Sequence, residues 1–200
     1  MKKRKKVLVI VAHPDDETIW MGGTILKNRD WDWTIFSLCR KNDADRAPRF
    51  RKVCKYYGAE CIIGDLDDEV LQPLAIEEVI NKIKEFLPDK KYDYIFTHGE
   101  NGEYGHLRHK EIHKAVKNMA ENGEIKCKKI YYFAYVDGER GAPHDSKIKI
   151  PVPSNGAAEI LRLDNSTYKD KYKLITQLYG FEKNIFETLS CHEFESFNVK

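Results

Sequence analysis

Residues 7–17 read VLVIVAHPDDE, and this stretch carries most of the information about the expected fold. Its first part, Val7–Ala12, is apolar throughout and lacks the polar alternation of a strand with one face in water. A continuously apolar strand needs cover on both faces, as in the centre of a parallel sheet flanked by helices. We therefore predict that Val7–Ala12 is a central strand, with His13 and the acidic residues after it at its carboxyl end.

Further short apolar runs indicate strands along the chain, at residues 34–38, 61–63, 94–97 and 130–136. Segments with helical spacing lie between or after them, at residues 24–27, 45–57, 75–87 and 110–119. Gly58 stands where a helix C-cap is expected. Because strands alternate with helices, we predict an α/β fold, a Rossmann-like, mostly parallel sheet with helices on both faces.

The rest of the sequence predicts a single domain over residues 1–200, because no repeat, low-complexity tract or long linker divides it. Three prolines and three glycines between residues 138 and 156 predict a long surface loop. Residues 160–163 and 168–179 predict a further strand and helix. This last third of the chain carries no motif that indicates chemistry.

The charge distribution is uneven. The 200 residues include 34 Lys and Arg against 32 Asp and Glu, a formal net charge of +2. Residues 2–6 are all basic, so the remainder carries −3. We interpret residues 1–6 as a solvated basic tail, with a weak contact to an anionic surface as the alternative. Because a nucleic-acid partner needs a basic stripe on the folded body, we expect none.

The composition also predicts a cytoplasmic protein without a membrane span. The longest early apolar run has six residues, whereas a spanning helix needs about 20 and a signal-peptide core about 7–15. The five cysteines form no C-x-x-C pair, which favours free thiols in a reducing compartment. Any metal would therefore be held by histidine and carboxylate ligands.

The residues after the first predicted strand are suited to holding a metal ion. Pro14 fixes its own φ and restricts His13 to extended geometry, so a stiff turn presents an imidazole and carboxylates to one crevice. Asp15, Asp16 and Glu17 would repel one another if buried together, and a divalent cation removes that cost. His13 with one aspartate is a suitable half-site for Zn²⁺, while the other aspartate acts as a base. The alternative is that both aspartates only cap the following helix.

A histidine-rich motif follows the fourth predicted strand. Residues 98–109 read HGENGEYGHLRH, and with His113 they include four of the seven histidines. In the strand order 3-2-1-4-5-6, strands one and four are neighbours, and ligands bind at the carboxyl ends of such strands. We therefore expect the two motifs to face each other across one crevice. His106 and His109 share a helix face at i, i+3, and both can enter it.

The other histidines are less suited to a metal. His113 could pair with His109 at i, i+4, but the chain lacks the H-E-x-x-H pattern, so we favour a helix-surface or supporting position for His113. We expect His98 to be packed behind the site, and His144 and His192 to be exposed or structural.

The two motifs together resemble the LmbE/PIG-L family of zinc-dependent N-acetylglucosamine deacetylases. The resemblance rests on residues 12–17, 22–24 and 101–109, which occur in the family's order and after the corresponding strands. It covers the chain as far as the helix expected at residues 110–119. The resemblance implies an LmbE-like fold for this part of the chain.

Roles for individual residues follow from this resemblance. It implies that His13, Asp16 and His109 bind one Zn²⁺ ion, with other divalent metals as alternatives, and that Asp15 is the general base. An open position would receive water and the substrate carbonyl.

The remaining roles concern the substrate. The resemblance implies that His106, in its protonated form, stabilises the oxyanion or helps to protonate the leaving amine, and that Tyr104 assists it. It suggests Arg46 as a sugar contact and, by a looser alignment, Asp68 as a contact to a sugar hydroxyl.

The function implied is removal of an N-acetyl group from a small-molecule N-acetylglucosamine-type sugar or sugar conjugate. One alternative is a nucleotide or phosphosugar transferase, but the chain lacks a G-x-G-x-x-G turn and its acidic loop would repel phosphate. A sugar- or metal-binding module without catalysis is the other. The sequence leaves the oligomeric state open, including a homo-oligomer.

Overall fold

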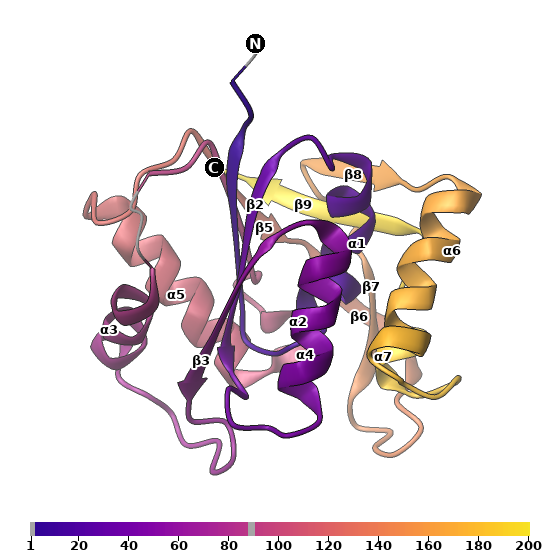
Figure 1. Cartoon of the computed structure of the whole chain (residues 1–200). Helices are drawn as coiled ribbons and strands as arrows, with labels where there is room; N and C mark the ends of the chain where they lie inside the picture. Colours follow the sequence, from indigo (N-terminus) through magenta and orange to yellow (C-terminus); the bar gives the residue numbers. More distant parts are fainter. Residues whose placement is uncertain (1–2, 88–90) are drawn as a thin grey trace.

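The computed structural model describes residues 3–87 and 91–200. Within these ranges, seven strands form one sheet in the order β3-β2-β1-β4-β5-β9-β8 (Figure 1). The strands are β1 (Lys6–Val11), β2 (Asp32–Cys39), β3 (Glu60–Leu66), β4 (Tyr94–Thr97), β5 (Lys129–Phe133), β8 (Glu159–Arg162) and β9 (Phe194–Val199). The first five in this order run parallel, and β9 and β8 are antiparallel to their neighbours. The predicted α/β class is confirmed.

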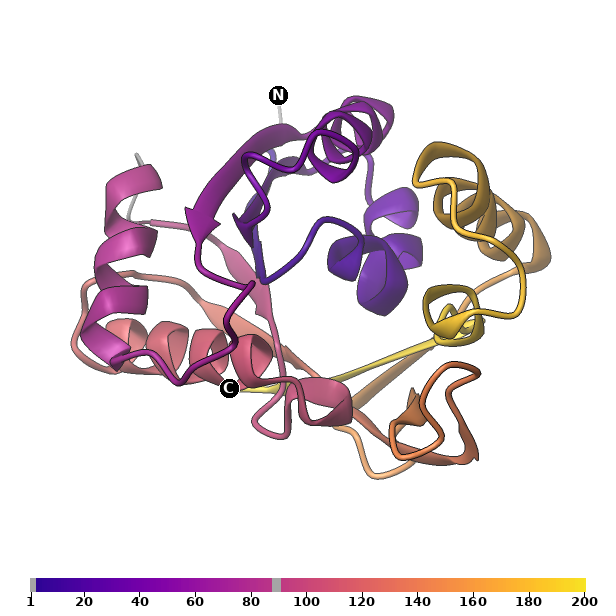
Figure 2. The same cartoon turned by 90° about the horizontal axis from the view of Figure 1, so that it is seen from below.

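Helices cover both faces of the sheet (Figure 2). One face carries α1 (Asp16–Lys27), α2 (Arg46–Tyr57) and α6 (Asn165–Lys173), and the other carries α3 (Ile76–Phe86) and α5 (Leu107–Glu121). Strand β1 contributes Val7, Val9 and Val11 to the first core and Leu8, Ile10 and Ala12 to the second, all fully buried. This double burial explains why residues 7–12 carry no polar side chain, whereas Lys6, at the start of the strand, is only partly buried.

The register of β1 places the two motifs side by side. Val9 is paired with Ile35 of β2 on one side and with Phe96 of β4 on the other. The loops after β1 and β4 therefore leave the sheet at the same edge, as the predicted strand order required. After β5, however, the next strand is β9, from far along the chain and antiparallel.

Residues 130–156 differ from the prediction. The run 130–136 is divided, because β5 ends at Phe133 and the chain continues as β6 (Tyr135–Gly141). The loop expected at 138–156 is instead mostly an antiparallel hairpin of β6 with β7 (Lys149–Pro153). Prolines in β7 are compatible with a two-stranded sheet, where each strand has a free edge.

Helix α1 begins at Asp16, earlier than predicted, and bends at Met21 (φ −149°, ψ 15°). The bend frees the N–H groups of Gly23 and Thr24, and the Glu195 carboxylate on β9 accepts both at 2.8 Å. Lys171 of α6 lies 2.8 Å from the same carboxylate, and both side chains of this ion pair are 0% exposed. A strand from the end of the chain thus fixes the helix that follows the first motif.

The boundaries of the other elements differ less from the prediction. The helix predicted at 168–179 is α6 followed by a π-helical turn, Leu174–Leu178. Gly58 caps α2 with φ 72°, as expected. The short helices α4 (Gly102–Gly105) and α7 (Phe186–Leu189) were not predicted.

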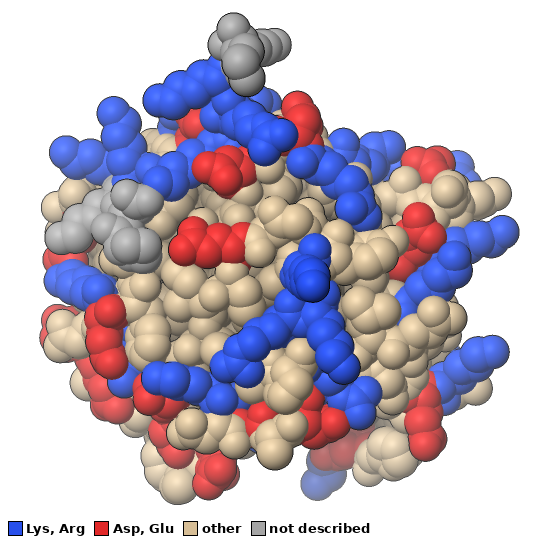
Figure 3. Space-filling model, viewed as in Figure 1, with Lys and Arg blue, Asp and Glu red and all other residues tan. Residues whose placement is uncertain are grey.

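Charge is distributed unevenly over the surface. Basic side chains crowd the end of the molecule where β1 begins, and acidic ones are more frequent at the opposite end (Figure 3). Lys6 of the predicted tail is part of β1, and Lys5 Nζ lies 4.3 Å from the centre of the Trp31 ring. Residues 1–2 of that tail lie outside the described residues. Among the helices of residues 3–87 and 91–200, none has the length and apolarity to cross a membrane.

Candidate active site

The two motifs meet where β1 and β4 end. His13 lies in the turn after β1, Asp16 begins α1, and His109 lies in the first turn of α5. His13 Nδ1 is 3.3 Å from Asp16 Oδ2 and 3.2 Å from His109 Nε2, and the latter two atoms are 3.4 Å apart. Asp16 and His109 are buried, and the His13 side chain is 15% exposed. The structure therefore brings together the three predicted metal ligands.

The spacing of these atoms fits a divalent metal ion. In a tetrahedral site with bonds of about 2.0–2.1 Å, ligand atoms lie about 3.3–3.4 Å apart, and Zn²⁺ accepts this set of donors. The charges around His109 also favour a cation at this position. Burial lowers the pKa of His109, but the carboxylates of Asp16 and Glu103 outweigh it and raise that pKa to about 10. The cluster formed by His13, Asp16 and His109 thus favours an added positive charge.

His98 is close to the cluster but is engaged elsewhere. Its Nε2 lies within 4.8 Å of ligand atoms of Asp16 and His109. That nitrogen already accepts a hydrogen bond from the Ala12 N–H at 2.9 Å, so its lone pair is occupied. With 0% exposure, His98 is packed behind the site, as the sequence predicted.

Asp15 occupies the turn into α1 with φ 122°, which is uncommon for a residue with a side chain. Its carbonyl accepts the N–H groups of Thr18 and Ile19, but its side chain makes no capping hydrogen bond. The carboxylate instead lies 2.5 Å from Arg46 Nη1 and lines the pocket. Burial and the Asp16 charge raise the pKa of Asp15 well above its usual range, while Arg46 lowers it. The alternative of helix capping alone therefore does not hold for Asp15.

Asp16 is oriented by its own helix. Its Oδ2 accepts the His13 N–H at 2.8 Å, and its Oδ1 accepts the Trp20 Nε1–H at 2.9 Å. Trp20 is fully buried one turn later. Sequence analysis gave Trp20 no role, although the i, i+4 spacing was a usable signal.

His106 and Tyr104 line the same pocket. The ring centre of His106 lies 4.7 Å from that of His13 and 4.6 Å from that of His109. Burial and the nearby charges of His109 and His13 lower the pKa of His106 to about 3. The imidazole is therefore neutral at pH 7 and can donate one N–H, which differs from the protonated form that we expected. Burial also raises the pKa of Tyr104 well above its usual range, so its hydroxyl stays protonated.

These side chains surround a pocket of about 300 Å³. Both predicted substrate contacts, Arg46 and Asp68, line it. Phe186 and Glu187 of α7 line it too, although we expected no chemistry from that part of the chain. The Arg46 guanidinium lies 3.9 Å from Glu187 Oε1 and 4.3 Å from the centre of the Phe181 ring. Because α7 has four residues and no motif, no sequence signal identified it.

Two fully buried glutamates support the site, and sequence analysis assigned neither a role. Glu103 Oε2 bridges the Nδ1 atoms of the stacked rings of His98 and His109, at 2.8 and 2.6 Å. Glu17 lies behind Asp15, where its Oε2 accepts the Asp15 N–H at 3.2 Å and its Oε1 accepts the Tyr179 hydroxyl at 2.7 Å. Both glutamates lie inside the two sequence motifs, so a charged side chain at these positions could have indicated a supporting role in the site.

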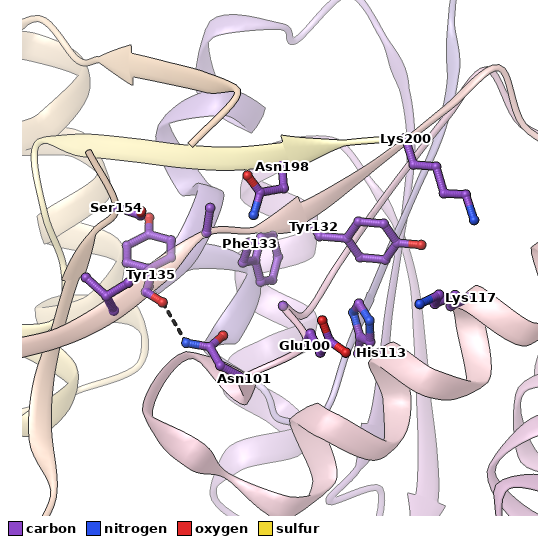
Figure 4. A pocket seen from close by; sticks show the side chains of 13 residues that line it. Glu100, Asn101, His113, Lys117, Tyr132, Phe133, Tyr135, Ser154, Asn198 and Lys200 are labelled. Carbon is purple, nitrogen blue, oxygen red and sulfur yellow. Dashed lines mark hydrogen bonds between the residues drawn. The ribbon is translucent and has the colours of Figure 1, made fainter. Parts of the chain in front are cut away.

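His113 lines a second cavity, of about 560 Å³, between α5 and strands β5 and β9 (Figure 4). Its Nδ1 lies 3.0 Å from the carbonyl oxygen of His98, and its ring centre lies 4.7 Å from that of Tyr132. This position agrees with a supporting role and not with ligation. His144 is exposed, and His192 Nε2 bonds to the Pro151 carbonyl at 2.7 Å.

Comparison with known proteins agrees with this geometry. The family described as PIG-L: GlcNAc-PI de-N-acetylase matches residues 8–120, which include His13, Asp16 and His109. The chain belongs to this family. The PIG-L match ends near the C-terminus of α5, so the hairpin and α7 lie outside it.

Two curated relatives match parts of this PIG-L chain. A 1D-myo-inositol 2-acetamido-2-deoxy-alpha-D-glucopyranoside deacetylase of Corynebacterium diphtheriae is 29% identical over 160 residues, covering 60% of this chain and 54% of that protein. The uncharacterized protein L374 of Acanthamoeba polyphaga mimivirus is 25% identical over 131 residues, 56% of each chain. The chain thus spans about half the length of these relatives.

Solved structures share the fold of this PIG-L chain over nearly its whole length. The N,N'-diacetylchitobiose deacetylase of Pyrococcus horikoshii has a TM-score of 0.63 at 16% identity, covering 100% of this chain and 85% of that one. GalB, a 4-carboxy-2-hydroxymuconate hydratase from Pseudomonas putida, has a TM-score of 0.61 at 13% identity, covering 98% and 95%. Since these two proteins carry different activities, the fold alone does not decide the reaction.

Proposed function

We propose that this protein is a zinc-dependent hydrolase that removes the N-acetyl group from an N-acetylglucosamine-type sugar or sugar conjugate. The observation that carries the proposal is the triangle of His13 Nδ1, Asp16 Oδ2 and His109 Nε2, with sides of 3.2–3.4 Å. The carboxylate of Asp15, which is not part of this triangle, lines the same pocket. Such an arrangement of three ligands with an adjacent base suits metal-assisted hydrolysis.

His13, Asp16 and His109 would hold the ion. When bound, the ion polarises the amide carbonyl and lowers the pKa of a coordinated water to about 7. Asp15 accepts the proton of the attacking water. Because burial raises its pKa, this carboxylate retains the proton long enough to return it to the departing nitrogen.

His106 and Tyr104 line the same pocket, where they would face the reacting amide. A neutral His106 donates its N–H to the developing oxyanion, where a preorganised donor is worth about 2.7–4 kcal/mol. The protonated hydroxyl of Tyr104 is a second donor on the same side. Neither group has to change its charge before the reaction.

The charge of the pocket supports an uncharged sugar substrate. Five carboxylates line it, against two guanidinium groups: Asp15, Asp16, Asp43, Asp68 and Glu187, with Arg40 and Arg46. Even with a divalent ion the surplus is negative, so a phosphate group is repelled and the product ammonium group is favoured. This argues against the nucleotide or phosphosugar transferase. The deacetylase relative and structural neighbour act on amino-sugar compounds by their names, which supports the proposal.

We also propose a cytoplasmic location, which the five unpaired cysteines support.

The test is an assay for free amine on a panel of N-acetyl sugars and sugar conjugates. Zinc-loaded protein is compared with protein treated with a chelator and with chelated protein to which zinc is restored. We expect amine release from at least one N-acetylglucosamine derivative, lost on chelation and recovered with zinc. No release from any member of the panel by zinc-loaded protein would refute the proposed function.

A further inference from the structure

Both histidines of the metal triangle contact a carboxylate through their second ring nitrogen. His13 Nε2 lies 3.1 Å from Asp68 Oδ1, and His109 Nδ1 lies 2.6 Å from Glu103 Oε2. The Asp68 and Glu103 side chains are 5% and 0% exposed. The carboxylates come from different elements, since Asp68 follows β3 and Glu103 lies in α4.

The hydrogen bonds around Glu103 determine which nitrogen of His109 carries a proton. The Ala12 N–H can only donate, so His98 Nε2 accepts from it at 2.9 Å and is unprotonated. His98 Nδ1 therefore carries the hydrogen and donates it to Glu103 Oε2 at 2.8 Å. The Gly99 N–H donates to the other oxygen of Glu103 at 2.7 Å.

Glu103 is thus an ionised acceptor on both oxygens. The partner of this carboxylate at 2.6 Å, His109 Nδ1, must therefore donate. The lone pair that can bind a metal is then on Nε2, the atom that belongs to the triangle.

A similar argument applies to His13, although its carboxylate neighbour Asp68 is less enclosed than Glu103. Asp68 Oδ2 accepts from Arg40 Nη2 at 2.6 Å, and its Oδ1 faces His13 Nε2. Asp68 Oδ1 has no hydrogen-bond partner among the described residues, so a hydrogen on His13 Nε2 would pair with it and leave the lone pair on Nδ1. The Arg40 side chain is 41% exposed, so this arrangement is open to water on one side.

We propose that Asp68 and Glu103 are positioning residues that fix the Nε2–H form of His13 and the Nδ1–H form of His109. Each carboxylate thereby directs one imidazole lone pair to the metal position. This inference rests on the metal dependence in the proposed function. It gives Asp68 a part in metal binding in addition to the substrate contact that the sequence suggested.

The first test measures zinc affinity by competition with a chromogenic chelator for the wild type, Glu103→Gln and Asp68→Asn. An amide presents an N–H₂ group where the carboxylate accepted, so one hydrogen-bond donor faces another. We expect zinc to bind about 10–100-fold more weakly in both variants, and most weakly in Glu103→Gln, since partners of metal-bound histidines typically have effects of this size.

Glu111→Gln is the matched control. Glu111 is also a buried carboxylate at the start of α5, but it pairs with Arg108 at 2.7 Å and does not contact the cluster. Thermal unfolding verifies that each variant is folded. If Glu103→Gln does not fold, Asp68→Asn still tests the inference, because Asp68 lies at the edge of the site.

A second measurement needs no variant. Two-bond ¹H–¹⁵N NMR spectra of zinc-loaded wild-type protein show which ring nitrogen carries the proton. We expect His109 protonated at Nδ1 and His13 at Nε2.

The opposite proton positions, or folded variants with wild-type zinc affinity, would overturn the inference. An Asp68→Asn variant that raises KM with unchanged zinc affinity would overturn the Asp68 part and identify a substrate contact. Because these readouts need no turnover, a zinc-binding protein without deacetylase activity would refute the proposed function and leave this inference intact.

Discussion

The floor and the rim of the site are built differently. The floor consists of His98, Glu103 and His109, each 0% exposed and joined by hydrogen bonds of 2.6–2.8 Å. The rim consists of four charged side chains from separate loops and helices: Arg40, Arg46, Asp68 and Glu187. Three of these four side chains are 24–41% exposed. Charge interactions are strong in the dry floor and screened at the wet rim, so the floor is suited to holding an ion and the rim to adapting to a substrate.

The largest expected effect comes from the floor. In His109→Ala a proposed ligand is lost, and the Glu103 carboxylate also loses one of its three hydrogen-bond partners. We expect zinc affinity to fall by more than about 100-fold, beyond the effect typical of groups that only support a ligand. The chelator competition assay measures this loss. His144→Ala, at an exposed position between β6 and β7, should bind zinc like the wild type. An equal affinity for the two variants would contradict the metal site.

Asp15 lies between floor and rim, and its substitution should separate binding from chemistry. We expect Asp15→Asn to lower kcat by about 10²–10⁴-fold, the usual contribution of a general base, with zinc affinity retained. Amine-release kinetics and zinc titration on the same preparation measure both quantities. Turnover near the wild-type rate would show that another group takes the proton.

Arg46 connects the rim to the base. Its charge lowers the pKa of Asp15, so Arg46→Met should raise that pKa further, and the base should be ionised only at higher pH. The acid limb of the kcat/KM profile is then expected to move to higher pH. Loss of a charged hydrogen bond of about 1.5–3 kcal/mol corresponds to roughly tenfold or more in kcat/KM at neutral pH. Arg51→Met, exposed on the same helix, is the control, and an unmoved acid limb in Arg46→Met would argue against the coupling.

The smallest effect is expected at the outer rim. Glu187 is 3.9 Å from Arg46 and partly exposed, and such pairs contribute about 0.2–1 kcal/mol. Glu187→Gln should therefore change KM by less than about tenfold and leave kcat unchanged. Steady-state kinetics with the best substrate of the panel measures this. A loss in kcat comparable to that of Asp15→Asn would place Glu187 in the chemistry.

The sequence predicts the cluster of His13, Asp16 and His109 better than the rim, for physical reasons. The apolar run of β1 predicts a buried strand, and His13 and Asp16 directly after it predict polar side chains at the carboxyl end of that strand. The parallel order then brings the second motif opposite. Glu103 was missed because its role depends on two histidine rings meeting in space. The rim was missed in part because Glu187 comes from a short helix whose position follows from tertiary packing alone.

The same limit applies to the fold. Local pattern predicts the parallel strands up to β5, because every connection between them except β3–β4 joins neighbours in the sheet. The antiparallel β9 and the β6–β7 hairpin depend on pairing between distant or proline-containing segments, which periodicity does not report.

The bend in α1 ties the metal site to the order in which the chain is synthesised. The N–H groups of Gly23 and Thr24 donate to the carboxylate of Glu195, which the ribosome adds long after His13 and Asp16. Until β9 emerges, the first motif has its residues but not its final support. A growing chain therefore presents His13 and Asp16 before the helix that follows them is fixed, and in the proposed metal site we expect tight binding of the ion only after β9 has joined the sheet.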